Sequence, residues 1–184
     1  GKVQAELTAT TRAGFHRYTF RDSEQPAVVL DLEHRDMVIE SGLRITGPDE
    51  IEGYRISRAW ADRQMVWFVA KFSKPFTSYS ISSGDNLVMG LTDLKGENIK
   101  ALFQFGNTGG ESLLVKVGIS GVDAEGARRN LLEEIPAWDF DTVAARARDR
   151  WDDALGKIRI DHASREQQVI FYTALYHALL QPNL

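Results

Sequence analysis

The sequence contains no cysteine. This absence excludes disulfide bonds, cysteine nucleophiles and thiolate metal sites together. No stretch approaches the roughly 18 consecutive apolar residues of a membrane-spanning helix, so we expect no membrane span. The chain also lacks a clustered basic face, because 22 Lys and Arg residues are scattered among 26 Asp and Glu residues, for a formal net charge of −4. This distribution offers no electrostatic footprint for nucleic acid.

The remaining composition is that of a folded globular domain. Of the 184 residues, 43% are hydrophobic and 26% are charged, which excludes an intrinsically disordered chain. The length allows one domain with a sizeable core and a short appendage.

The first two-thirds of the sequence predicts β-structure. Apolar and polar residues alternate in VQAELTAT (3–10), NIKALFQF (98–105) and LLVKVGIS (113–120), the period of half-buried strands. This alternation predicts that Val3, Leu7 and Ile119 face inward. In MVWFVAKF (65–72) both faces are apolar, which predicts a central strand covered on both sides. About nine strands without intervening helices favour an antiparallel β-sandwich.

The glycine-rich segment GNTGGE (106–111) invites comparison with a phosphate-binding loop. Neither a Lys-Ser/Thr pair nor a predicted helix follows it, so we interpret it as a hairpin turn.

Helical patterns replace the strands from residue 122. DAEGARRNLLEEI (123–135) has an acidic N-cap candidate, Asp123, and ends before Pro136; a second helix is predicted from Phe140 to Leu155. Ser164 and Gln167 form a capping-box pattern that opens a last helix, which Pro182 closes. This last helix is apolar over well over half its circumference, which predicts partner helices in addition to the sandwich.

Catalytic patterns are absent from the sequence. The histidines His16, His34, His162 and His177 have no metal-site spacing, and we interpret them as structural or solvated. No nucleophile, base and orienting residue form a recognisable set.

Two acidic pairs occur in the helical region. The pairs are Glu133–Glu134 and Asp152–Asp153. Adjacent residues point in different directions on a helix, so we interpret both pairs as solvated.

Five aromatic residues could stack on sugar rings: Tyr18, Tyr54, Trp60, Trp67 and Tyr79. Aromatic residues at alternate strand positions normally fill a sandwich core, so we predict core positions for all five. The alternative is a stand-alone carbohydrate-binding module that uses Trp60 as its platform.

Six longer segments follow one another in an order that is distinctive as a whole. They are AELTATTRAGFHRYTF (5–20), VVLDLEH (28–34), GYRISRAWADRQMVWFVAKFSKPF (53–76), LLVKVGISGVDAEGARRNLLEEIPAWDFDTV (113–143), WDDALGKI (151–158) and FYTALYHALLQPN (171–183). This succession resembles glycoside hydrolase family 92, bacterial calcium-dependent exo-acting α-mannosidases, over nearly the whole chain.

The resemblance implies a mainly β fold: an antiparallel β-sandwich of the galactose-mutarotase-like supersandwich type, followed by linker helices and an (α/α)6 catalytic barrel. It predicts a β-sandwich over 1–121, without its opening strands. It predicts linker helices over 122–157 and the first helix of the catalytic domain over 158–184. The last helix would then be a barrel helix whose partners lie beyond Leu184.

The resemblance also implies a function for the whole enzyme. It would hydrolyse terminal α-mannosides of glycans with inversion, as an α-1,2-type mannosidase, in the periplasm or outside the cell. Its catalytic carboxylates and its calcium site would lie in the barrel, and no residue of this chain matches a catalytic, carbohydrate-binding or metal-binding position. The chain alone is therefore expected to be inactive and structural, without a bound metal. We expect it to dock on the barrel and to self-associate through its last helix.

Overall fold

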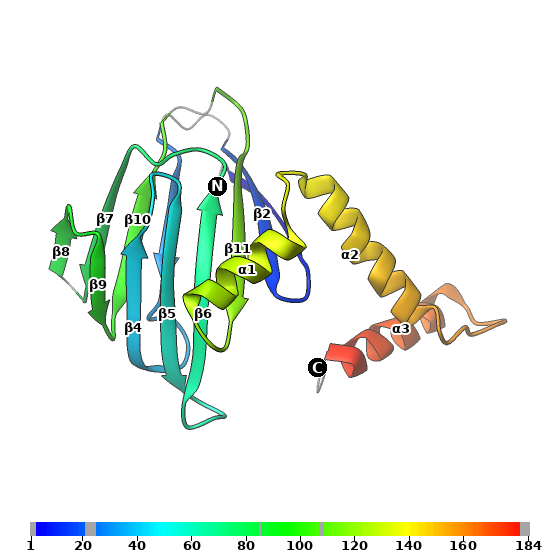
Figure 1. The fold of residues 1–184 in the computed structure, drawn as a ribbon. Helices are drawn as coiled ribbons and strands as arrows, with labels where there is room; N and C mark the ends of the chain where they lie inside the picture. The colour runs from blue at the N-terminus through cyan, green and yellow to red at the C-terminus, as the bar shows by residue number, and fades with distance from the viewer. Residues whose placement is uncertain (1–2, 21–24, 85, 107–108, 181–184) are drawn as a thin grey trace. The chain divides into compact units, whose positions relative to one another are not determined.

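The computed structural model describes residues 3–20, 25–84, 86–106 and 109–180. Its strands are β1 (Val3–Ala9), β2 (Ala13–Phe20), β3 (Ala27–Asp31), β4 (Met37–Ile45), β5 (Glu50–Arg58), β6 (Gln64–Phe72), β7 (Ser78–Ser83), β8 (Asn86–Met89), β9 (Asp93–Gly96), β10 (Ile99–Gln104) and β11 (Leu113–Ser120). Three helices follow: α1 (Ala124–Glu134), α2 (Phe140–Leu155) and α3 (Arg165–Leu180) (Figure 1).

The strands form two antiparallel sheets. One sheet has seven strands in the order β1-β2-β11-β6-β5-β4-β9, and the other has four in the order β3-β10-β7-β8. The hydrophobic core lies between them, with Phe72, Leu43 and Ile51 from the large sheet and Phe103 and Ile81 from the small one. The predicted antiparallel sandwich is confirmed.

The prediction of β-strands is confirmed, but the predicted number of strands is too low. The described residues contain eleven strands, against about nine predicted. The hairpin interpretation of GNTGGE is wrong, because β10 before it belongs to the small sheet and β11 after it belongs to the large one. In this segment Gly109 and Gly110 have positive φ angles of 62° and 86°, while Asn107 and Thr108 lie outside the described residues.

Strand β6 occupies the middle of the large sheet, as its two apolar faces predict. Phe68, Ala70 and Phe72 face the core between the sheets. Val69 faces the opposite side and is fully buried, on the face where α1 covers β6 and β11 (Figure 1).

The inward orientation predicted for β1 and for the end of β11 does not produce burial. Val3, Leu7 and Ile119 are 52%, 67% and 45% exposed. β1 is an edge strand, and its apolar side chains share a face with Phe20 and Tyr18 of β2, which lie in or against the core, yet they remain exposed. Period-2 alternation thus reports which residues share a face, but a second layer decides whether that face is buried.

The helix starts and stops follow the sequence signals. Asp123 caps α1 by accepting a hydrogen bond from the Gly126 amide at 2.6 Å. The capping box at α3 is formed in both directions: the Gln167 amide donates to Ser164 Oγ at 3.2 Å, and the Ser164 amide donates to Gln167 Oε1 at 2.8 Å. Pro182, the predicted stop, lies outside the described residues.

The chain divides into two compact units, Gly1–Val143 and Ala144–Leu184. The first turn of α2 therefore belongs to the β unit, and Phe140 and Val143 are buried there. The domain boundaries at 121/122 and 157/158 stay predictions.

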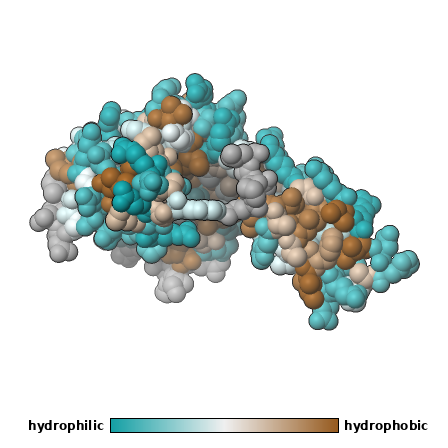
Figure 2. Space-filling view, turned by 90° about the horizontal axis from the view of Figure 1, so that it is seen from below, coloured by the Kyte–Doolittle hydropathy of each residue, from teal (hydrophilic) through white to brown (hydrophobic). Residues whose placement is uncertain are grey.

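In the second unit, α3 is apolar yet has no buried residue. Trp151 and Tyr176 pack with ring centroids 4.7 Å apart, while Val169 and Ile170 are 53% and 63% exposed. Figure 2 shows a broad brown patch over this helical unit. Among the described residues, no helix is long and apolar enough to cross a membrane.

Candidate functional site

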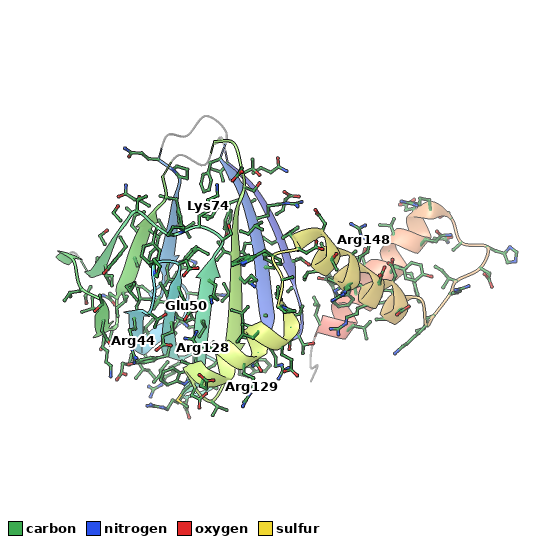
Figure 3. The ribbon with its side chains drawn as sticks, turned by 45° about the horizontal axis from the view of Figure 1, so that its top comes forward. Arg44, Glu50, Lys74, Arg128, Arg129 and Arg148 are labelled. Carbon is green, nitrogen blue, oxygen red and sulfur yellow. The ribbon has the colours of Figure 1, made fainter. Side chains whose placement is uncertain are left out.

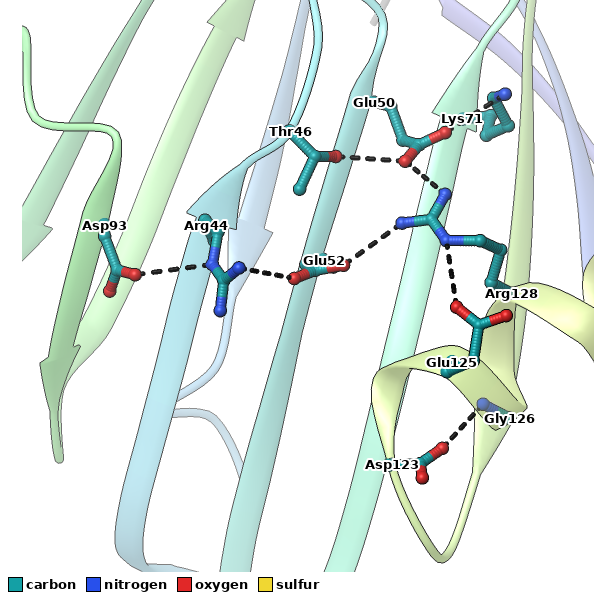
Figure 4. Close-up of polar contacts among 10 residues, drawn as sticks. All are labelled: Arg44, Thr46, Glu50, Glu52, Lys71, Asp93, Asp123, Glu125, Gly126 and Arg128. Carbon is teal, nitrogen blue, oxygen red and sulfur yellow. Dashed lines mark hydrogen bonds and ion pairs between the residues drawn. The ribbon is translucent and has the colours of Figure 1, made fainter.

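A row of charged side chains crosses the outer face of the large sheet beside α1 (Figure 4). Glu50 of β5 contacts Arg128 of α1 and lies 3.0 Å from Lys71 Nζ. Figure 3 shows Glu50 on the sheet next to Arg128. Two strand positions further, Glu52 accepts from Arg128 Nη2 at 3.1 Å and lies 3.3 Å from Arg44 Nη1. We call Arg44, Glu50, Glu52, Lys71 and Arg128 the charged row.

The charged row attaches α1 to the sheet. Burial by itself would raise the pKa of Glu50, but hydrogen bonds from Arg128, Lys71 and Thr46 outweigh it and lower that pKa below its ordinary value of 4.5. A carboxylate held ionised by two cations is neither a general acid nor a free metal ligand. The charged row is therefore structural.

Replacing Glu50 by Gln is expected to lower stability by about 1–3 kcal/mol at neutral pH, because Arg128 and Lys71 lose a nearly buried anionic partner. The folded-state pKa of Glu50 is lowered, so its stabilisation is present above 4.5 and is lost as the pH falls below that value. Thermal unfolding at pH 7 and pH 3.5 should show a smaller acid-induced decrease in the variant than in the wild type.

Glu125→Gln is the matched control. Glu125 also faces Arg128, at 3.9 Å, but its side chain is 79% exposed. We expect a change of at most about 0.5 kcal/mol for this exposed pair. Equal losses in the two variants would contradict the attachment role of Glu50.

A shallow recess of about 120 Å³ lies beside the charged row. Tyr54 and Trp67 form one wall, with ring centroids 4.6 Å apart. The Tyr54 ring lies over Gly42, where a Cβ would come within 2.4 Å of the ring. Burial, with the hydrogen bond to Glu40, raises the pKa of Tyr54 to about 12. Ligand pockets usually enclose about 300 Å³ or more, so we do not assign a ligand to this recess.

Lys116 of β11 is a second anchor for the helical segment. It is only 4% exposed, and its Nζ donates to the Ile135 carbonyl at 3.0 Å, at the C-terminal end of α1. The same ammonium lies 4.2 Å from the centroid of the Trp138 ring. Burial lowers the pKa of Lys116, and the nearby charge of Lys71 lowers it further.

Arg17 of β2 fixes the first turn of α2. Its guanidinium lies over the Phe140 ring at 4.3 Å and donates to both carboxylate oxygens of Asp141, at 3.0 and 3.1 Å. It also pairs with Glu6 of β1 at 2.7 and 2.8 Å, and these hydrogen bonds raise the pKa of Arg17.

The solvated interpretation of Glu134 is wrong. Its side chain is 12% exposed, accepts from Thr10 Oγ1 and the Arg12 amide, and pairs with Arg12 Nε. The Glu133 side chain is 66% exposed, in agreement with the predicted solvated position. The β1–β2 turn, distant in sequence, decides which glutamate is enclosed.

The five aromatic residues that were predicted to lie in the core differ in how far they are buried. Tyr54 is buried, Tyr18 and Tyr79 pack against the core cluster, and Trp67 is half-buried on the outer face. The core prediction for Trp60 is wrong, because its side chain is 94% exposed in the turn between β5 and β6.

The four histidines lie in separate segments of the chain. His16 hydrogen-bonds Tyr18 Oη at 2.9 Å, and burial lowers the pKa of His16. His34 and His162 lie in loops, and His177 lies in the last turn of α3. Within the part of the chain that the structure describes, no three His, Asp or Glu side chains form a metal-binding group.

Sequence patterns did not reveal the residues that hold the helices to the sheet. Arg128, Lys116 and Arg17 were unremarkable charged residues in the sequence. The available signal was the even spacing of Glu50 and Glu52 on one strand face, which places two carboxylates beside each other on one side of a sheet.

Two protein-family models match this chain, one over its strands and the other over its helices. The model of the glycosyl hydrolase family 92 N-terminal domain matches residues 1–120. The model of the family 92 catalytic domain matches residues 126–184.

Solved structures extend the likeness to the whole chain. The family GH92 α-mannosidase BT3965 from Bacteroides thetaiotaomicron is 30% identical, with a TM-score of 0.90 over 99% of this chain and 26% of its own. The family GH92 inverting mannosidase BT2199 from the same organism is 28% identical, with a TM-score of 0.88 over 98% of this chain and 24% of its own.

A curated relative gives a shorter match. An uncharacterized secreted glycosidase from Arthroderma benhamiae is 30% identical over 85 residues, which are 44% of this chain and 11% of the relative. The chain thus spans about a quarter of the solved relatives and about a tenth of this one. With one family model covering its strands and another its helices, the chain belongs to glycosyl hydrolase family 92.

Proposed function

We propose that this chain is the N-terminal part of an exo-acting α-mannosidase that hydrolyses terminal α-mannosides of glycans with inversion, as an α-1,2-type enzyme. The observation that carries the proposal is the likeness to the α-mannosidase BT3965, at a TM-score of 0.90 over 99% of this chain. The inverting outcome is supported by BT2199, whose description is that of an inverting mannosidase.

Inverting hydrolysis needs two carboxyl groups on opposite sides of the glycosidic bond. One protonates the leaving oxygen and the other activates a water molecule. The described acidic residues around Arg17, Arg128 and Arg12 are engaged in ion pairs that hold the fold together. As the family resemblance implies, we assign both catalytic carboxylates to the part of the enzyme outside this chain.

The same reasoning applies to calcium. The family resemblance implies the ion, but the described residues offer no group of three suitable side chains. Oxygen ligands from several residues are what calcium requires, so we place its site in the same outside part of the enzyme.

In the proposed hydrolysis step the role of this chain is structural, without a catalytic residue of its own. The uncovered faces are the sites where the rest of the polypeptide would pack: the apolar face of β1 for the opening strands, and the exposed side of α3 for further barrel helices. A free apolar helix in water favours self-association, so the isolated chain is also proposed to associate through α3. The secreted relative supports a periplasmic or extracellular location.

A hydrolysis assay tests the proposal. The 184-residue chain is expected to release no mannose from α-1,2-mannobiose in the presence of calcium, whereas the full-length parent protein is expected to release it as the β-anomer. Proton NMR of the first-formed sugar identifies the anomer. Mannose release by the chain alone would refute the structural role, and α-mannose from the parent would refute inversion.

A further inference from the structure

Two loops lie side by side at one end of the large sheet. Met37, the first residue of β4, pairs with Arg58, the last residue of β5. The loop of residues 32–36 before β4 is therefore next to the turn of residues 59–63 after β5. Figure 1 shows the β5–β6 turn at the bottom of the β unit. We call residues 32–36 and 59–63 the two-loop end.

Trp60 projects from the turn with both faces of its indole accessible. It is 94% exposed, and its neighbours Ala59 and Ala61 have side chains too short to cover the ring. The turn has internal hydrogen bonds, from the Ala59 amide to the Ala61 carbonyl at 3.2 Å and from Arg58 Nε to the Asp62 carbonyl at 3.4 Å. A ring presented on an ordered turn loses little conformational entropy when a ligand stacks on it.

Arg55 of β5 holds the neighbouring loop of residues 32–36 in place. Its guanidinium donates to three backbone carbonyls, those of Leu32 at 2.9 Å, His34 at 3.2 Å and Asp36 at 2.9 Å. One arginine thus holds the backbone of the loop. Within the loop, Glu33 pairs with Lys100 at 2.6 Å, and His34 and Arg35 are exposed.

The same loop holds one residue in an unfavourable conformation. Arg35 has a φ of 91°, in the left-handed region that residues other than glycine rarely adopt. The Asp31 carboxylate stabilises the turn by accepting from the Glu33 amide at 2.9 Å and the His34 amide at 3.0 Å. Strained and firmly anchored loop residues concentrate at binding sites. The His34 and Arg35 side chains are both exposed.

An exposed aromatic ring on a turn next to a loop that carries an exposed imidazole and an exposed guanidinium matches the chemistry of a pyranose. The apolar C–H face of the sugar stacks on the ring, and its hydroxyl groups bond to the polar side chains. Of the five aromatic residues that could stack on sugar rings, four are buried or partly buried, and Trp60 is exposed. The charged side chains of Arg58, Asp62 and Arg63 are exposed around it, which favours a polar ligand over an apolar protein surface.

We propose that the two-loop end binds a hexopyranose of an α-mannoside glycan, with Trp60 as the stacking surface and the 32–36 loop as the hydroxyl-binding side. This sugar contact lies in the β-sandwich, separate from the catalytic carboxylates assigned above, and it rests on the proposed function for its substrate class.

Titration of the 184-residue chain with α-1,2-mannobiose tests the site without any requirement for catalysis. Saturation-transfer NMR and quenching of the exposed-tryptophan fluorescence should both report binding. Trp60→Ala is expected to weaken binding by about tenfold or more, and Trp60→Phe, which keeps a flat ring, by no more than about threefold. Leu132→Ala removes another exposed apolar side chain, on α1, and should bind as the wild type does.

Three results would overturn the site: no binding by the wild-type chain, equal binding by Trp60→Ala and the wild type, or equal weakening in Leu132→Ala. A change in oligomeric state of Trp60→Ala, measured by analytical ultracentrifugation, without an effect on sugar binding would instead assign Trp60 to a protein contact. Failure of the proposed function is read separately, as absence of mannose release by the parent enzyme.

Discussion

A chain that ends at residue 121 is expected to lose cooperative folding, whereas a chain that ends at residue 155 is expected to keep it. Residue 121 is where sequence patterning places the end of the β-sandwich. In the structure, however, Leu131, Ile135, Phe140 and Val143 are 1–8% exposed and complete the β unit. Burying each side chain contributes about 1.5–3 kcal/mol, so the four together approach the whole stability of a typical domain.

The shorter chain also leaves polar groups without partners. Lys116, 4% exposed in the intact chain, would lose the Ile135 carbonyl and the Trp138 ring. Glu50 and Glu52 would lose Arg128.

Circular dichroism and calorimetric melting of the chains ending at residues 121, 155 and 184 provide the measurement. The chain ending at 155 should show a cooperative transition within a few degrees of the β-unit transition of the 184-residue chain. A comparable transition in the chain ending at 121 would show that α1 and the start of α2 are dispensable.

Gly118→Ala is expected to destabilise the β unit by about 3 kcal/mol or more. Gly118 lies on β11 under α1, and an added Cβ would be 2.2 Å from the Ala127 carbonyl oxygen and 2.7 Å from Leu131 Cβ. Backbone oxygen cannot turn aside as a flexible side chain can, so α1 would have to move away from the sheet. Overpacking of this kind typically costs about 1–3 kcal/mol, and a displaced helix places this case at the upper end or beyond.

Gly121→Ala provides the control, because nothing lies within 4 Å of the position that an added Cβ would occupy there. It should change the free energy of unfolding by less than about 0.5 kcal/mol. Urea unfolding of both variants at pH 7 gives the comparison. A Gly118→Ala variant as stable as Gly121→Ala would mean that α1 does not pack closely on β11.

The elements that were predictable from sequence have local causes. The apolar faces of β6 and β10, the Asp123 cap and the Ser164–Gln167 capping box depend on residues a few positions apart. Such patterns are set by backbone periodicity and by the unsatisfied amides of a helix start, which are the same in any fold.

The failed predictions all concern residues whose environment depends on parts of the chain that are distant in sequence. Leu7 and Ile119 have the predicted alternation but are 67% and 45% exposed. Trp60 is a large aromatic residue of the kind that fills a core, but it lies in a turn and is exposed. Glu134 was predicted to be solvated, but it is enclosed by contacts with Thr10 and Arg12. The segment GNTGGE connects two sheets, although locally it has the glycines of a hairpin.

The sequence by itself determined the class of the chain: a cysteine-free β-sandwich with three helices, and membership of family 92 through the order of its segments. Tertiary structure alone decided that α1 and the first turn of α2 belong to the β unit, and that Arg17, Lys116 and Arg128 hold them there. It also decided which aromatic residue is free to meet a ligand. The reason is that periodicity is a property of neighbouring residues, whereas burial and charge pairing are properties of surfaces brought together from distant parts of the chain.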